Sequence, residues 1–142
     1  MEANVNPSRL LTIVGLVGIG LIHLLDSVDT YSETRWLFWA YVALMAGTII
    51  VGGALLHRPD ARWFAAAALL AATPIVGYIF SRTTGLPGSH DDIGNWTEPL
   101  GLASLWVEGA VLAISGYALA LVAATRPAPA PSRPLAFGPL EG

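Results

Sequence analysis

The residues able to do chemistry in this sequence include a short segment, HLLDSVD, in which His23, Asp26 and Asp29 are spaced three apart. On a helix of about 3.6 residues per turn, this spacing brings an imidazole and two carboxylates toward one corner. Such ligands suit zinc, copper or iron better than magnesium. With His90 from a polar segment further along, they predict a transition-metal site formed by His23, Asp26, Asp29 and His90. The two aspartates are equally consistent with solvated turn residues or helix caps.

One carboxyl group, that of Glu108, lies within a long apolar run that starts at Pro99. On a helix rising about 1.5 Å per residue, Glu108 lies roughly 13 Å below the start of that run. Placing an acid at the centre of a membrane helix costs about 2.5 to 3.5 kcal/mol, so Glu108 must be neutral or partnered. Its candidate partners are Arg82, His23, Tyr41, Tyr78 and Ser104. Two interpretations stay open: a protonated acid that only joins helices, and a ligand or proton site.

The segment SRTTGLPGSHDDIGNWTEP, residues 81–99, is polar and rich in turn formers. Gly85, Pro87, Gly88 and Gly94 predict a compact loop that caps the mouth of a helix bundle. Arg82 and Glu98 stand at the two ends of this loop, where an ion pair between them would close it. We therefore add Glu98 to the predicted ligand site of Glu108, His23, Arg82, Tyr41, Tyr78 and Ser104.

The elements that must position these residues are four apolar segments. The chain has 142 residues, of which 54% are hydrophobic and 12% charged, too little polar surface to cover a soluble globule. Residues 10–27, 36–56, 63–80 and 99–124 approach the 20 or so residues that cross a bilayer. They are apolar all round, which indicates helices and not barrel strands. Short connections between them predict an all-α, antiparallel bundle of four transmembrane helices within residues 1–125.

Helical periodicity indicates which face of the last segment points inward. One face carries Thr97, Gly101, Ser104, Glu108 and Ser115, and Trp106 lies on the other. We expect the polar face to point into the bundle and Trp106 toward lipid.

Arginine placement predicts the orientation of the bundle. One side of the membrane receives five arginines and the other two, so the positive-inside rule places both termini in the cytoplasm. The five are Arg9, Arg58, Arg62, Arg126 and Arg133, and the two are Arg35 and Arg82. The absence of lysine and abundance of alanine suggest a bacterial inner-membrane protein. The first segment has an acid before Arg9 and no small-residue cleavage pattern, so we expect a retained helix. The proline-rich residues 126–142 are expected to be a disordered cytoplasmic tail.

Several classes of chemistry find no support. The chain contains no cysteine, which excludes disulfides, thiolate metal sites and thiol nucleophiles. Haem held by two histidines is not expected, because His23 and His57 lie at different depths. Ser104 and Ser115 lack a basic partner and a glycine elbow, so no catalytic residue is assigned and an enzyme is the less favoured reading.

The motif SRTTGLPG, followed by acids and by EPLGLASLWVEG, resembles a family of small four-helix membrane proteins common in actinobacteria. The resemblance covers most of the chain except the proline-rich end. It implies the four-helix fold and an association of His23, Arg82, Glu98 and Glu108, and it implies no activity.

These observations favour a small integral membrane protein with an outward-facing polar pocket that binds a cation, a transition metal or a small ligand. One alternative is an accessory subunit of a larger membrane complex, in which Glu108 or the tryptophans would point outward. Another is a proton or ion carrier, which would need a polar path from Glu108 to the cytoplasm. The expected partners are the lipid bilayer and another membrane protein or a second copy of the chain. No nucleic-acid partner is expected.

Overall fold

The computed structural model of this chain describes residues 2–125, and the predicted tail therefore lies outside the described residues. Four helices make up nearly all of the described chain: α1 (Glu2–Glu33), α2 (Arg35–His57), α3 (Ala61–Thr83) and α4 (Pro99–Ala124). All four are long and apolar enough to cross a membrane. The chain is thus an all-helical bundle with the composition of a multi-pass membrane protein.

The predicted segments match three helices to within a few residues, but α1 is longer at both ends than residues 10–27. At its polar end, the hydroxyls of Ser27 and Thr30 donate to the backbone oxygens of Leu24 and Asp26, at 2.6 and 2.8 Å. A hydroxyl that bonds to a backbone oxygen about one turn earlier keeps its residue in helical conformation, so the helix continues through these polar residues. Asp26 and Asp29 therefore lie inside α1, and the alternative interpretation of them as turn residues or caps is wrong.

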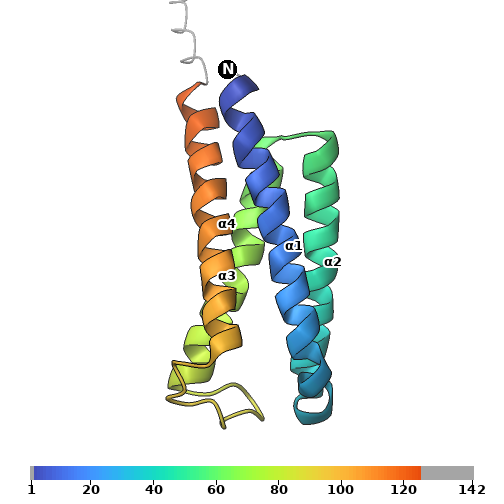
Figure 1. The fold of residues 1–142 in the computed structure, drawn as a ribbon, viewed down its shortest axis with the longest axis vertical. Helices are drawn as coiled ribbons and strands as arrows, with labels where there is room; N and C mark the ends of the chain where they lie inside the picture. The colour runs from blue at the N-terminus through green and yellow to red at the C-terminus, as the bar shows by residue number, and fades with distance from the viewer. Residues whose placement is uncertain (1, 126–142) are drawn as a thin grey trace, which may run out of the picture.

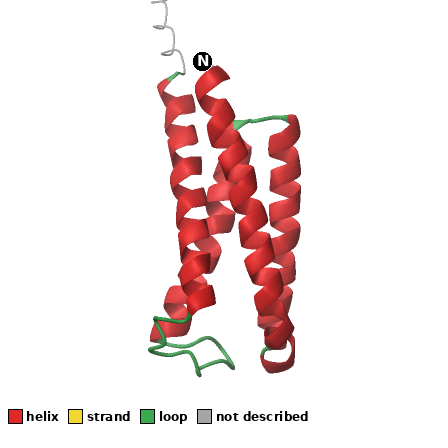
Figure 2. Ribbon diagram, in the orientation of Figure 1, coloured by secondary structure: helices red, strands yellow, loops and turns green. Residues whose placement is uncertain are grey.

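The four helices form a ring in which each packs against its neighbours in the chain and α4 also packs against α1. Figure 1 shows the α1–α2 connection and the long α3–α4 loop at one end of the bundle, with the α2–α3 connection at the other. Figure 2 shows that the α3–α4 loop, residues 84–98, is the one extended non-helical segment among the described residues. We call the end that carries this loop the loop end.

The half of the bundle away from the loop end is closely packed. Side chains of all four helices meet there in an apolar core whose fully buried members include Leu16, Leu55, Phe64 and Val111. Small residues make this possible: a Cβ atom on Gly15 would clash with Val111, so α1 and α4 approach closely at that point. Toward the loop end, Figure 1 shows α1 and α4 diverging.

The outer surface of the helices is apolar along their length. Leucine, isoleucine and valine side chains more than half exposed include Leu11, Val17, Ile49 and Leu69. A soluble protein rarely exposes so much continuous apolar surface, whereas lipid tails cover it at no cost. Trp106 is 82% exposed on this surface and Glu108 is buried, as the periodicity of α4 predicts.

Candidate functional site

The loop at the loop end is compact because its glycines adopt conformations that other residues avoid. Gly85, Gly88 and Gly94 have positive φ angles of 79°, 77° and 81°. Leu86 and Ser89 exchange two backbone hydrogen bonds of 2.8 Å around the Pro87-Gly88 turn. The amide of Gly94 also donates to the backbone oxygen of Arg82, at 2.9 Å, which ties the loop back to α3. The turn chemistry read from the sequence therefore corresponds to a folded cap.

Arg82 holds the loop from inside. Its side chain is only 6% exposed, and Nη1 lies 2.6 Å from Asp92 Oδ1 while Nη2 lies 3.7 Å from Glu98 Oε2. The first contact is an ion pair by distance, although its angles are not those of a hydrogen bond. The guanidinium also lies 4.7 Å from the centre of the Tyr78 ring. The expected ion pair between Arg82 and Glu98 is present, and Asp92 is a second, closer partner.

Glu98 also begins α4. Its two carboxylate oxygens accept hydrogen bonds from the amides of Leu100 and Gly101, at 2.8 and 2.5 Å. These bonds satisfy two of the amides left free in the first turn of a helix. One carboxylate thus joins the end of α3, through Arg82, to the start of α4.

Glu108 lies deeper in the bundle and is 1% exposed. Its Oε1 accepts a hydrogen bond from the hydroxyl of Ser104, one turn earlier on α4. His23 Nε2 lies 3.9 Å from the same oxygen, too far for a direct hydrogen bond. The prediction that Arg82 reaches Glu108 is not fulfilled, because the guanidinium is held by Asp92 and Glu98 instead.

The ring of His23 is fixed from two sides. Its Nδ1 lies 2.9 Å from the backbone oxygen of Ile19, and the Tyr41 ring contacts it edge-to-face with centroids 4.9 Å apart. Because a carbonyl oxygen only accepts, Nδ1 carries the proton in that bond. Nε2 is then free to interact with a ligand or with Glu108.

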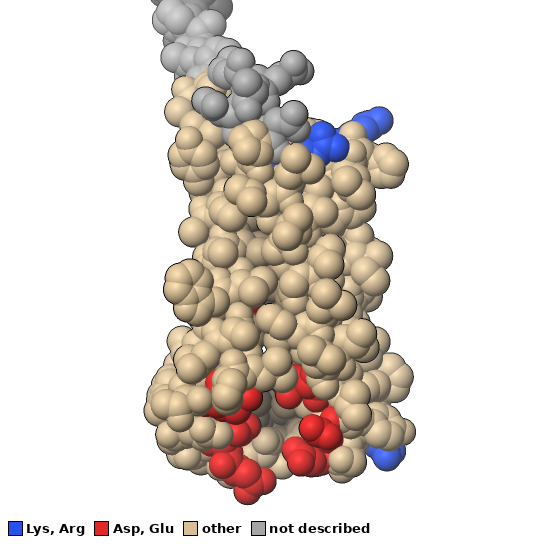
Figure 3. Space-filling view, in the orientation of Figure 1, with Lys and Arg blue, Asp and Glu red and all other residues tan. Residues whose placement is uncertain are grey.

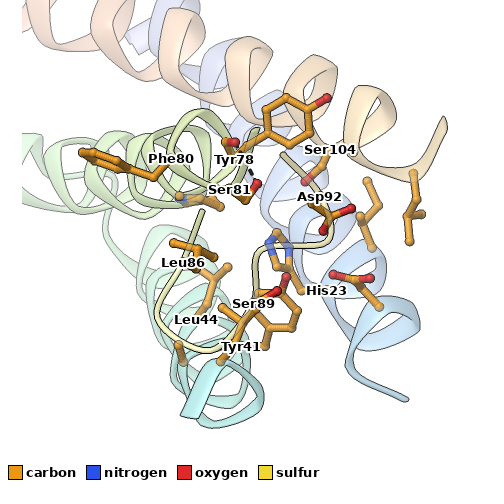
Figure 4. Close-up of a pocket in the computed structure, with 18 of the residues that line it drawn as sticks. His23, Tyr41, Leu44, Tyr78, Phe80, Ser81, Leu86, Ser89, Asp92 and Ser104 are labelled. Atoms are coloured by element: carbon orange, nitrogen blue, oxygen red, sulfur yellow. Dashed lines mark hydrogen bonds between the residues drawn. The ribbon is translucent and has the colours of Figure 1, made fainter. Parts of the chain in front are cut away.

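These side chains line one cavity of about 630 Å³ at the loop end. Figure 4 shows His23 of α1, Tyr41 of α2, Tyr78 of α3 and Ser104 of α4 around it, with Asp92 of the loop nearby. All seven residues of the predicted ligand site line the cavity: His23, Tyr41, Tyr78, Arg82, Glu98, Ser104 and Glu108. Volumes of this order hold small organic ligands.

The cavity is strongly acidic. Six carboxylates line it and Arg82 is its one guanidinium; the carboxylates are those of Asp26, Asp29, Glu33, Asp92, Glu98 and Glu108. Figure 3 shows acidic side chains on both sides of a hollow at the loop end. Of these six, Asp92 and Glu98 form ion pairs with Arg82, and the other four have no arginine partner within the described residues. A cavity with this excess of negative charge attracts cations.

The predicted metal ligands do not assemble. Within residues 2–125, no three His, Cys, Asp or Glu side chains are arranged so that they could hold a metal ion. His23, Asp26 and Asp29 line the cavity, but His90 does not; it is exposed and packs near Gly85. A transition-metal site formed by these four residues therefore has no support in the geometry.

Two residues that line the cavity were not part of the predicted ligand or metal site. Glu33 lines the cavity one helix turn beyond Asp29, and its i+4 spacing on the same helix was the available signal. Trp36 also lines it and donates from Nε1 to the backbone oxygen of Pro87, at 2.7 Å. That bond joins the start of α2 to the loop. No local sequence pattern predicts it, because the two residues are 51 apart in the chain.

Comparison with known proteins assigns no function to the chain, so a function has to be argued from this geometry. No protein-family model, no curated protein and no solved structure matches the chain. The resemblance to small actinobacterial membrane proteins stays a prediction. Chemically, the site offers a fixed imidazole, a buried carboxyl group and unpaired acids, which together suit binding of a positively charged group.

Proposed function

We propose that this chain is a small integral membrane protein that binds a positively charged small ligand in the cavity at its loop end. The single observation that carries the proposal is the position of Glu108. It is a fully buried acid with one hydroxyl donor, and it lies in a cavity with five further carboxylates and one guanidinium. A carboxylate removed from water gains most from a cationic partner, and within residues 2–125 only His23 lies within ion-pair distance of it.

The proposed setting is a bacterial inner membrane, with antiparallel helices and both termini in the cytoplasm. Arg9, Arg58 and Arg62 belong to the end away from the loop, while Arg35 and Arg82 belong to the loop end. Arg126 and Arg133 lie outside the described residues. The positive-inside rule then directs the loop end, with its acids, outward.

The carrier alternative is less well supported. Below Glu108, the bundle interior is closed by Leu16, Ile19 and Val111, all at most 1% exposed. The buried hydroxyls of Thr12 and Ser115 lie beyond this apolar layer and have no hydrogen-bond partner among residues 2–125. Near this layer, the buried hydroxyl of Thr48 beside Gly20 already donates to the backbone oxygen of Met45, at 2.8 Å. An ion moving toward the cytoplasm would therefore meet mainly apolar side chains there.

The accessory-subunit alternative predicts an outward-pointing Glu108 or tryptophans. Glu108 points inward, whereas Trp106 is exposed at mid-helix. Exposed tryptophans, Trp106 and also Trp39 at 60% exposed, keep a membrane partner, or a second copy of the chain, as the second candidate.

The test is binding of butylammonium, a small water-soluble cation, to the full-length chain in lipid nanodiscs, followed by ligand-observed NMR at constant ionic strength. We expect saturable binding that weakens at least about tenfold in Glu108→Gln, which corresponds to about 1.4 kcal/mol or more. Asp60→Asn removes the same charge from the α2–α3 connection and should leave binding unchanged. Absence of saturable binding by the folded wild type, or equal binding by Glu108→Gln, would contradict the proposal.

A further inference from the structure

We infer that the ligand is an amphiphile: its protonated amine lies among the acids of the cavity, and its single hydrocarbon chain passes between α2 and α3 into the bilayer. This inference rests on the proposed function and names the class of ligand. The inference depends on three features of the cavity: the separation of its polar and apolar walls, the position of its opening, and the buried polar groups that face it.

The cavity walls divide by chemistry. The helices α1 and α4 contribute polar groups, among them His23, Asp26, Ser104 and Glu108. The apolar and aromatic side chains come mainly from α2 and from the deeper part of α3: Trp36, Leu37, Ala40, Leu44, Pro74, Val76 and Phe80. The α3 helix also contributes Thr73, Ser81 and Arg82, and the last of these is held by Asp92 and Glu98. A ligand that satisfies both walls has a charged end and an apolar end.

The apolar wall is open to the outside. Of its members, Trp36, Val76 and Phe80 are 46%, 50% and 52% exposed, although they line the cavity. By contrast, His23 and Glu108 on the polar wall are 5% and 1% exposed. The helices α2 and α3 also contact each other less extensively than the other neighbouring pairs. A Cβ atom on Gly77 of α3, which lines the cavity, would meet no atom within 4 Å.

This opening faces the depth of the bilayer occupied by hydrocarbon. Trp36 is at the start of α2, where tryptophan typically marks the interface. Leu44 lies two turns further on, roughly 12 Å deeper. A hydrocarbon chain in the opening would therefore continue among lipid tails, with no need to cross polar head groups.

The charged end of the ligand is identified by the buried groups. His23 Nε2 has no hydrogen-bond partner among the described residues, and Figure 4 shows the ring directed into the cavity. Glu108 has one hydroxyl donor and no strong cationic partner. An ammonium group supplies three donors to such acceptors. Asp26, Asp29 and Glu33 at the mouth have no ion pair with an arginine in the described chain.

The same acids argue against a phospholipid. A phosphate beside Asp26 and Asp29 would be repelled, and Arg82, the one guanidinium in the cavity, is already held by Asp92 and Glu98. A bare metal ion leaves most of a cavity of about 630 Å³ empty and finds no ligand cluster in the part of the chain that the structure describes. The chemistry that fits is a cationic amphiphile without an anionic group.

The experiment compares butylammonium, dodecylammonium and uncharged dodecanol on the full-length chain in phosphatidylcholine nanodiscs. We expect dodecylammonium to bind more than about tenfold more tightly than butylammonium, because its chain concentrates it in the bilayer beside the opening. Dodecanol should not compete. If the cavity opened only to water, partition into the bilayer would instead weaken the apparent binding of the long-chain amine.

The outcomes separate the two proposals. Binding of butylammonium without tighter binding of dodecylammonium would overturn this inference and leave the proposed function standing. Binding of neither amine to the folded chain would overturn both. Competition by dodecanol would show that the charge is not recognised, which also overturns the inference.

A matched pair of variants locates the opening. Gly77→Leu should weaken dodecylammonium binding at least about tenfold, because the new side chain fills the path between α2 and α3. Gly116→Leu adds the same side chain to an open position on α4 and should have no effect. Should Gly77→Leu fail to fold, a photoreactive diazirine on the dodecyl chain gives an independent answer. Crosslinks should map to α2 and α3, and crosslinks confined to α1 and α4 would overturn the inference.

Discussion

Two serines on one face of α4 lie in opposite halves of the bundle and differ in their surroundings and hydrogen bonding. Ser104 lines the cavity and donates to Glu108, whereas Ser115 is fully buried and its hydroxyl has no partner. The difference follows from how closely α1 and α4 approach. Gly15 lets the helices touch in the half with Ser115, and they diverge toward the loop end. Polarity on a helix face therefore makes a site only where neighbouring helices leave room.

The largest expected effect tests this contrast in packing. Gly15→Leu should lower the free energy of unfolding by about 2 to 3 kcal/mol, because the side chain must displace Val111 and part α1 from α4. Gly77→Leu, in the cavity half, should change it by less than about 1 kcal/mol. Reversible unfolding in mixed micelles measures both. Equal destabilisation would show that the two halves are packed alike.

A smaller effect is expected at the loop. Arg82→Leu leaves Asp92 and Glu98 without their cation. We expect the free energy of unfolding to fall by about 2 kcal/mol, which is less than for a fully buried ion pair because both acids are partly exposed. Arg62→Leu breaks the exposed pair with Asp60 and should cost less than about 1 kcal/mol. Protease cleavage within residues 84–98 should accelerate only in Arg82→Leu. An unchanged loop in that variant would remove the role assigned to the guanidinium.

The smallest effect concerns the serines themselves. Ser104→Ala should lower the free energy of unfolding by about 1 kcal/mol, since Glu108 loses its hydroxyl donor. Ser115→Ala should be neutral or stabilising, because it removes a buried hydroxyl that has no partner. The same unfolding measurement compares them. A larger loss for Ser115→Ala would indicate a hydrogen bond that this structure does not contain.

Much of the fold was predictable from local properties. Long apolar segments predicted four helices, and the periodicity of α4 predicted that Glu108 points inward and Trp106 outward. Glycine and proline in the loop predicted its compact turns. The first segment was predicted too short, because hydropathy falls at the polar residues of α1 while helical hydrogen bonding continues.

The candidate site was only partly predictable, because partner choice depends on geometry between helices. The seven residues can be grouped from their type and depth, yet no local signal favours Asp92 over Glu108 as the partner of Arg82. His90 was grouped with His23 by ligand type alone, and the loop places it outside the cavity. The less extensive contact between α2 and α3 depends on how closely two helices pack, which no single segment encodes.

The most direct test of the central claim uses the absence of cysteine in the chain. Ser104→Cys and Ser115→Cys each introduce a single thiol, and their labelling by N-ethylmaleimide can be followed in native membranes with and without butylammonium. The account predicts that Ser104→Cys is labelled and is protected by butylammonium, and that Ser115→Cys is not labelled in either condition. Equal labelling at the two positions, or labelling of Ser104→Cys that butylammonium does not slow, would contradict it.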